Sequence, residues 1–275
     1  MIHSIAHPTD FSPEGQAAFE HALYLALANR CRLDLLHVHD PRADRDADND
    51  AHRDWDRFPH VRKTLQRWGL LEPGARTDEV KEVTGIDVRK VEISDIGAGD
   101  GLAHYIRDHR PDLIVIASHG RAGLSQWLSP SISTGVARET IIPTLILGPL
   151  ARPFVDSMTG HIHLESVLVP VDHAPAPQEA VLHLRALVES LDVGIDFLHV
   201  GPDAPVLLDN GKEPLAVRRI DGPVVETLLD QARQASMVVM PMAARRDLLD
   251  LVRGSTTDRV VREVTCPVLA LPTAA

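Results

Sequence analysis

The sequence has few cysteine and aromatic residues and no long apolar run. Its 2 cysteines, Cys31 and Cys266, lie far apart in apolar surroundings, and aromatic residues make up 4% of the chain. Such cysteines suit burial in a reducing compartment better than a disulfide framework. No stretch approaches the ~18 apolar residues of a membrane helix, and residues 1–10 do not resemble a signal peptide. We therefore expect a cytoplasmic protein without a membrane span.

Basic residues are also in deficit. The chain has 28 lysine and arginine residues against 39 aspartate and glutamate residues, a net charge of −11. Because proteins bind nucleic acids by neutralising phosphates with lysine and arginine, this charge argues against a nucleic-acid partner. A small phosphate ligand stays open, since backbone N–H groups at a helix N-terminus hold an anion without a basic surface.

The same order of patterns occurs twice in the 275 residues, a length that itself favours two domains. The stretch that begins at Ser4 aligns without a gap with one that begins near Val167, which places Asp10 opposite Asp172. The ends of the halves match as well, since "PDLIVIASHG" parallels "ASMVVMPMAA" and "IIPTLILGP" parallels "TCPVLALP". The chain therefore reads as two fused copies of one domain.

Within each half, apolar runs of strand length alternate with stretches of helical periodicity. This alternation is typical of βαβ units and a parallel sheet. We therefore predict two tandem open α/β domains, each with a mostly parallel, five-stranded, Rossmann-like sheet. The expected strands lie near Ile2–Ala6, Leu33–Val38, Val88–Ile93, Leu113–Ala117, Thr144–Leu147, Ser166–Val169, Gly194–His199, Leu215–Arg219, Met237–Met240 and Val268–Leu271. The helices with the clearest periodicity are Gln16–Ala28 and Leu102–His109.

The alignment also predicts domain boundaries. The first domain spans residues 1–150 and carries an insertion at about 41–76, within which Trp55–Leu71 has the pattern of an amphipathic helix. Residues 151–163, which contain a proline and a glycine, form the expected linker. The second, shorter domain spans 164–275.

The stretch from Ile114 to Glu139 has the pattern best suited to binding a ligand. A strand leads into a small polar turn, then a loop and the start of a helix, and open α/β sheets bind ligands beyond the carboxyl ends of their strands. Ser131, Ser133 and Thr134 offer hydroxyl groups where helix N–H groups face an anion. This segment therefore predicts an anion site.

This loop resembles that of the ATP-binding branch of the universal stress protein family, which reads G, two residues, G, nine residues, G, then Ser or Thr. Here the chain has Ala117-Ser-His-Gly120, nine residues, and Pro130-Ser131, and "SHGRAGLS" is close to the family form. The resemblance covers nearly all the chain outside the insertion and linker. It implies an adenine nucleotide, ATP or AMP, with or without Mg²⁺, in the first domain. The first-domain site residues it implies are Asp10, Val38, Ala117, His119, Gly120, Arg121, Ser131 and Ser133.

Both loops depart from the family pattern. Ala117 and Pro130 replace two glycines in the first loop, and proline has no N–H to give a phosphate, although it fits the first turn of a helix. In the second half, Pro241-Met-Ala-Ala244 replaces the first glycine pair. The second loop is therefore the less able to hold a triphosphate. The second-domain candidates are Asp172, Val200, Gly254, Ser255 and Thr256.

Several candidates have a purely structural interpretation as well. The resemblance places Asp10 and Asp172 near a ribose, but each could instead cap the following helix. Val38 and Val200 correspond to a position whose backbone meets adenine, yet both are ordinary core valines by type. His119 could contact phosphate or a backbone carbonyl group, and Arg121 could be solvated.

The 15 histidines include two His-x-His pairs, His37 with His39 and His161 with His163. A zinc site needs about four ligands, and no neighbouring cysteine or acidic cluster completes either pair. We expect no metal site. A structural role is the interpretation for His37.

The resemblance implies a stress-response regulator or sensor rather than a catalyst. A nucleotide-free scaffold that has lost ATP binding is the first alternative, and a weak ATP hydrolase is the second. No nucleophile motif surrounds Ser131, which favours binding over catalysis. Because domains of this family tend to pair through their last strands, "PTLILGP" and "CPVLALP" are expected to join the halves as an internal pseudo-dimer. An unidentified protein partner and a homodimer both stay open.

Overall fold

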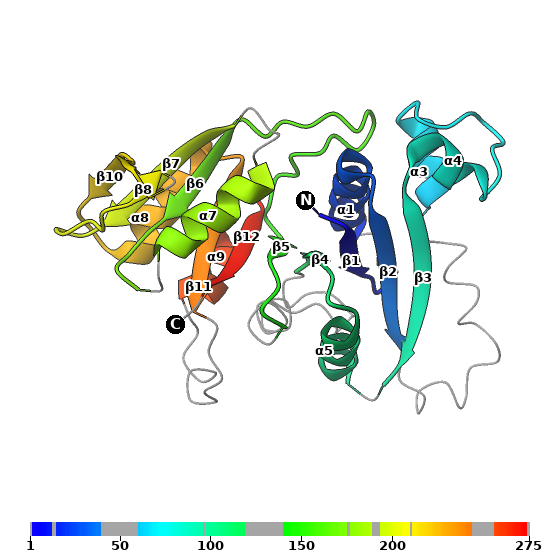
Figure 1. The fold of residues 1–275 in the computed structure, drawn as a ribbon, viewed down its shortest axis with the longest axis horizontal. Helices are drawn as coiled ribbons and strands as arrows, with labels where there is room; N and C mark the ends of the chain where they lie inside the picture. The colour runs from blue at the N-terminus through cyan, green and yellow to red at the C-terminus, as the bar shows by residue number, and fades with distance from the viewer. Residues whose placement is uncertain are drawn as a thin grey trace.

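One sheet of 10 strands runs through the whole molecule in the computed structural model (Figure 1). The strand order is β10-β7-β6-β11-β12-β5-β4-β1-β2-β3. The structure describes residues 2–12, 15–39, 60–95, 97–118, 140–174, 177–188, 193–209, 211–243 and 256–273. The first half contributes β1 (Ser4–Pro8), β2 (Arg32–His39), β3 (Asp87–Ser94), β4 (Leu113–Ala117) and β5 (Thr144–Leu147). The second contributes β6 (Ser166–Pro170), β7 (Gly194–Val200), β10 (Val217–Ile220), β11 (Met237–Ala243) and β12 (Val268–Thr273).

The two halves repeat one topology. From the outer edge inward, the first half runs β3-β2-β1-β4-β5 and the second runs β10-β7-β6-β11-β12, with every pair inside a half parallel. The last strands of the halves pair antiparallel, with Leu269 of β12 opposite Leu145 of β5. The predicted fold class, two tandem open α/β domains with mostly parallel sheets, is confirmed.

Continuous apolar runs produce the central strands. All five residues of β4, Leu-Ile-Val-Ile-Ala, are buried, as expected for a parallel strand covered on both faces. β1 is equally buried but ends in His7 and Pro8, and proline, which cannot donate to a ladder, belongs at a strand end. β1 therefore lies two residues later than the predicted Ile2–Ala6, since His7 and Pro8 do not continue the apolar run on which the prediction rested.

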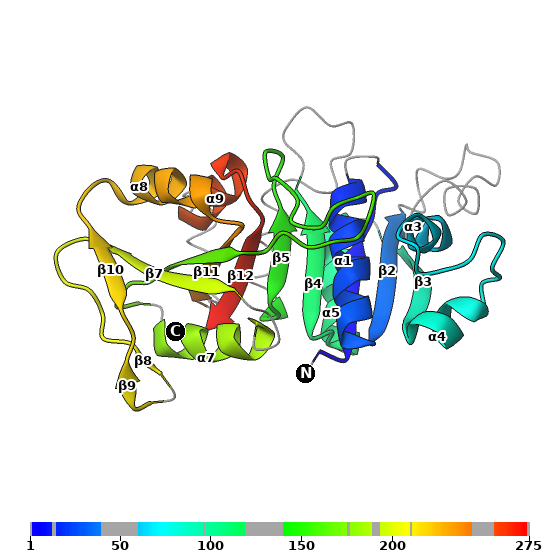
Figure 2. The same cartoon turned by 90° about the horizontal axis from the view of Figure 1, so that it is seen from above.

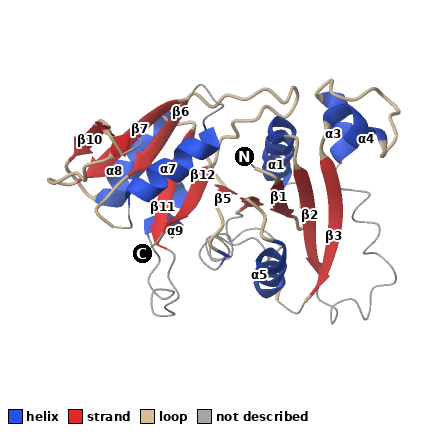
Figure 3. Cartoon of the chain, in the orientation of Figure 1, coloured by secondary structure: helices blue, strands red, loops and turns tan. Residues whose placement is uncertain are grey.

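Helices cover both faces of the sheet, with α1 and α5 on opposite sides of the first half (Figure 2). Figure 3 shows the alternation of helix and strand along the chain. α1 is rich in alanine and leucine, strong helix formers, and is followed by Arg30, which adopts a left-handed conformation with φ 48°. The helices are α1 (Gln16–Asn29), α3 (Val61–Arg67), α4 (Glu79–Thr84), α5 (Ala98–His109), α7 (Pro177–Val188), α8 (Val224–Gln231) and α9 (Thr256–Glu263). Among the described helices, none is long and apolar enough to span a membrane.

The middles of the two halves differ. The first half carries α3, inside the predicted helix Trp55–Leu71, and α4, whereas the second carries a short hairpin of β8 (Leu208–Asp209) and β9 (Glu213–Pro214). The Leu215 N–H group donates to Leu207 O at 2.9 Å, so Leu215 belongs to the hairpin segment, and β10 starts at Val217 rather than at Leu215 as predicted.

Residues 151–163 pack against the first half. Phe154 and Val155 are buried, and Val155 forms a bridge with Ile162. The Phe154 N–H group donates to His21 Nε2 of α1 at 3.1 Å, and Trp68 Nε1, just after α3, donates to Ser157 O at 3.1 Å. We call residues 151–163 the strap, because they fasten α1 and α3 together.

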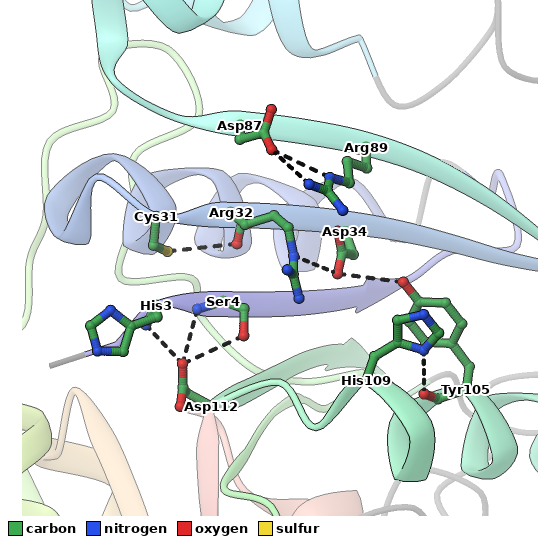
Figure 4. A network of polar contacts seen from close by, with 10 residues as sticks. All are labelled: His3, Ser4, Cys31, Arg32, Asp34, Asp87, Arg89, Tyr105, His109 and Asp112. Carbon is green, nitrogen blue, oxygen red and sulfur yellow. Dashed lines mark hydrogen bonds and ion pairs between the residues drawn. The ribbon is translucent and has the colours of Figure 1, made fainter.

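A polar network holds the amino ends of the first three strands (Figure 4). The Asp112 carboxylate accepts the backbone N–H groups of His3 and Ser4, at 2.8 and 3.0 Å. In β2 the buried Asp34 accepts Arg32 Nε at 3.0 Å and the Tyr105 hydroxyl at 3.4 Å. This network lies at the edge of the sheet opposite to the expected ligand edge.

Candidate functional site

The carboxyl ends of β1 and β4 separate. These strands pair only at Ile5 with Leu113 and Ala6 with Ile114, although β1 continues to Pro8. From here the chain winds outward in both directions, to β2 on one side and β5 on the other. Such a switch point is where open α/β sheets bind ligands.

His7 fills the space beneath this split. It is fully buried, and its Nδ1 lies 2.9 Å from the Val115 carbonyl oxygen, to which it donates in the neutral ring. Burial lowers the pKa of His7 from 6.5 to about 4, so the ring is neutral at neutral pH. The imidazole thus supplies a donor to β4 where the β1–β4 ladder has ended.

The turn after β1 fixes the position of Asp10. The Thr9 N–H group donates to Leu36 O of β2 at 2.8 Å, and Asp10 Oδ1 accepts the Ser12 N–H group at 3.0 Å. Phe11, between them, has a left-handed backbone with φ 59°. The N-cap residue of α1 is Gly15, so the Asp10 carboxylate closes this turn rather than serving as the N-cap of the helix. Asp10 is half-buried at the mouth of the split.

Val38 and Ala117 line the neighbouring strand ends. Val38, near the end of β2, is 3% exposed and Ala117, the last residue of β4, is 2% exposed. A Cβ atom on Gly101 of α5 would lie 3.1 Å from Val38 Cγ1, so the glycine allows α5 to approach this end of β2 closely. The Val38 side chain therefore packs in the core, and only the backbone of Val38 could face a ligand.

Ser118 follows Ala117 and was not singled out from the sequence. It is buried, and its N–H group donates to Leu147 O at 2.8 Å. Its hydroxyl has no hydrogen-bond partner among the described residues. The sequence did contain a signal for Ser118, because it is the first polar residue after the apolar run of β4.

The structure brings Asp10, Val38 and Ala117 to the carboxyl ends of three adjacent strands. The remaining first-domain candidates, His119, Gly120, Arg121, Ser131 and Ser133, lie outside the described residues. So do Pro130, Gly254 and Ser255, while Thr256 is described only as the first residue of α9.

The second half repeats the split with different side chains. β6 and β11 pair only at Val167 with Met237 and at Leu168 with Val238. Asp172 is exposed and accepts the His173 N–H group at 2.7 Å. Val200 ends β7 and is half-buried.

Met242 occupies the position in β11 that corresponds to Ser118, and it is buried. Pro241 precedes it in a part of β11 that pairs only with β12. The second edge is therefore more apolar than the first.

In each half, one histidine holds the turn that follows the first strand. His37 Nδ1 lies 3.0 Å from Thr9 O, and His199 Nδ1 lies 2.9 Å from Val171 O. The His37 ring also packs on Phe11, with ring centroids 4.2 Å apart. The repeated Leu-His-Val sequence was the signal for this shared contact, which positions the turn that carries Asp10.

The described cysteines and candidate metal ligands form no reactive site. Within the described residues, no three His, Cys, Asp or Glu side chains gather as metal ligands do. Cys31 and Cys266 are free and buried, and burial raises the pKa of each thiol to about 11. Neither thiol is therefore activated as a nucleophile.

The fold and the split edge define a duplicated α/β protein with one potential ligand site in each half. The chain belongs to the universal stress protein family, whose model matches residues 1–148 and 206–272. A universal stress protein of Mycolicibacterium smegmatis is 26% identical over 187 residues, 58% of this chain. The match spans 61% of that relative's length.

Solved structures resemble the whole chain in fold. A universal stress protein from Archaeoglobus fulgidus DSM 4304 superposes with a TM-score of 0.62 at 18% identity, covering 98% of each chain. A protein of unknown function from Pseudomonas aeruginosa PAO1 gives a TM-score of 0.58 at 16% identity, covering 98% of this chain and 92% of its own. At these identities the likeness shows the fold alone.

Proposed function

We propose that the chain binds an adenine nucleotide, ATP or AMP, in its first domain and acts as a stress-response regulator rather than a catalyst. The observation that carries the proposal is the split between β1 and β4, with Asp10 held at its mouth. Family membership supports the choice of ligand. The domains are residues 1–150 and 164–275, and the chain acts in the cytoplasm as an internal pseudo-dimer joined through β5 and β12.

Each part of the site has a distinct task in this proposal. The Asp10 carboxylate accepts hydrogen bonds from the ribose hydroxyls, because an ionised oxygen is a strong acceptor. The Val38 backbone meets the adenine ring. Gly120, Ser131 and Ser133 bind the phosphates together with His119 and Arg121, and Mg²⁺ would neutralise part of the phosphate charge.

A nucleotide-free scaffold is the second candidate, and the second half favours it. Buried Met242 and the preceding Pro241 replace the polar and glycine-rich turn that a phosphate needs. In that case the second domain serves as a packing partner of the first. A weak ATP hydrolase is the third candidate, which steady phosphate release abolished by Ser131→Ala would support.

Thermal unfolding with ATP, with AMP and without ligand separates binding from the scaffold. A ligand at ten times its Kd that binds only the folded chain adds about 1.4 kcal/mol. For a protein of this size the midpoint should rise by roughly 3–5 °C. An unchanged midpoint at millimolar concentrations of both nucleotides would support the scaffold.

A further inference from the structure

α3 and α4 lie beside the outer strand β3, at the end of the first half away from the second half (Figures 1 and 2). Residues of these elements and of the turns between them line a cavity of about 790 Å³. Small-molecule sites usually have volumes of roughly 300–1,000 Å³. The second half has the β8–β9 hairpin in place of these helices, so among the described residues α3 and α4 are features of the first half alone. The described part of the second half therefore offers no counterpart of this frame.

Contacts on both sides hold the cavity open. α3 is fastened to α1, where Arg67 Nη2 lies 2.6 Å from Glu20 Oε1. α4 is fastened to the sheet by Val80, which is buried with Ile86 in the core. Arg62 Nη1 donates to Ala75 O at 3.3 Å and so ties α3 to the turn before α4. The walls are thus connected without a ligand.

The floor of the cavity is apolar. Ala75, Val80 and Ile86 are buried, and the partly buried Val61 and Val88 pack against the same core. An apolar floor favours the apolar body of an organic molecule over a hydrated inorganic ion.

The rim of the cavity is basic, although the chain carries a net charge of −11. The charged residues lining it are four bases and two acids, Arg62, Lys63, Lys81, Lys90, Asp78 and Asp87.

Both acids have partners outside the lining. Arg76 Nε donates to Asp78 at 3.0 Å, and Arg89 Nη2 donates to Asp87 at 3.2 Å. Lys81 also pairs with Asp87, at 3.4 Å. Arg62 and Lys63 are therefore not needed to balance these two acids, and their positive charge at the rim favours an anionic group.

We propose that this cavity binds an organic anion, an apolar body with a carboxylate or phosphate head. The body lies on the valine and isoleucine floor, and the head meets Arg62 and Lys63 at the rim. The site is separate from the split edge, and it does not depend on whether that edge binds a nucleotide.

Calorimetric titration with decanoate tests the proposal, with decyltrimethylammonium as a probe of equal chain length and opposite charge. Decanoate should bind and the cation should not. Lys63→Glu should weaken decanoate binding by about tenfold, or about 1.4 kcal/mol, because it places a negative charge where the anionic head needs a positive one. Lys212→Glu, an equal charge reversal on an exposed turn outside the cavity, should leave it unchanged.

A second variant tests the floor. Val88→Thr keeps the shape of the side chain but replaces a methyl group with a hydroxyl, and should weaken decanoate binding by about fivefold. Saturating ATP should not displace decanoate. Equal binding of both probes, no binding of decanoate, or equal effects of the Lys63 and Lys212 variants would overturn the proposal.

Discussion

His7 shows how a buried titratable group supports the split edge. Its neutral ring donates to Val115 O, and its pKa of about 4 lies below the ordinary value of 6.5 because the charged form loses its hydration. The unfolded chain therefore binds protons before the folded chain does as the pH falls. The folded state loses stability between about pH 6.5 and pH 4, and the loss from this group ends below its folded pKa.

His7→Asn tests this account, since the asparagine amide can still donate to Val115 O but does not titrate. The wild type should lose about 3 kcal/mol more than the variant when urea unfolding is compared at pH 7.5 and pH 4. His21, also buried with a pKa of about 4, remains in both proteins and gives the same contribution to each. Identical pH dependence in the two proteins would contradict the assignment.

The sequence predicts the position of some residues at the split edge but not of others. The position of Asp10 was predictable, because a polar residue directly after a buried parallel strand lies at the ligand edge of the sheet. His7 and Ser118 were not, because their burial depends on where β1 and β4 cease to pair, which neither strand's own sequence specifies.

At the scale of elements, strands β4 and β5 have the predicted bounds. Both are buried throughout, and a fully buried parallel strand has a continuous apolar run with clear ends. The strap was predicted only as a linker, because Pro153 and Gly160 are typical of loops. Phe154 packs on His21 of α1, and Ser157 accepts the Trp68 Nε1–H group; both partners lie more than 80 residues earlier in the chain.

Gly160 is the strictest requirement of the strap. Its φ of 71° disfavours other residues, and a Cβ atom here would lie 2.6 Å from Trp68 Cδ2. Gly160→Ala should lower the free energy of unfolding by roughly 2–4 kcal/mol, the sum of backbone strain and overpacking. Gly74→Ala is the matched control, since φ is 86° but no atom lies within 4 Å, and it should cost only about 1–2 kcal/mol. Equal losses in urea unfolding would show that the Trp68 contact does not matter.

The whole molecule is organised around the seam between the halves. Val268, Leu269 and Ala270 of β12 pair antiparallel with β5, which makes one sheet from two copies of the fold. Gly148, directly after β5, lies against α9 of the second half, where an added Cβ atom would approach the Val261 carbonyl oxygen to 2.4 Å. Because that contact is with backbone, it cannot relax by a side-chain rotation.

Gly148→Ala should therefore separate the halves and lower the unfolding free energy by about 1–3 kcal/mol. Differential scanning calorimetry should show one transition for the wild type and a broader or split transition for the variant. Gly194→Ala is the control. Its added Cβ atom would lie 3.5 Å from Glu165 O, an ordinary contact, so the free energy of unfolding should change by no more than about 0.5 kcal/mol. An unaltered transition for Gly148→Ala would show that the seam does not couple the halves.

Calorimetric titration of the full chain with ATP tests most directly whether the first-half split is the nucleotide site. We predict one ATP per chain, with binding weakened at least about tenfold by Asp10→Asn, because the ribose would lose a charged acceptor while the turn keeps its shape. Asp172→Asn, the same change at the matching position of the second half, should leave affinity and stoichiometry unchanged. Absence of binding to the wild type, or an equal loss in both variants, would contradict the account.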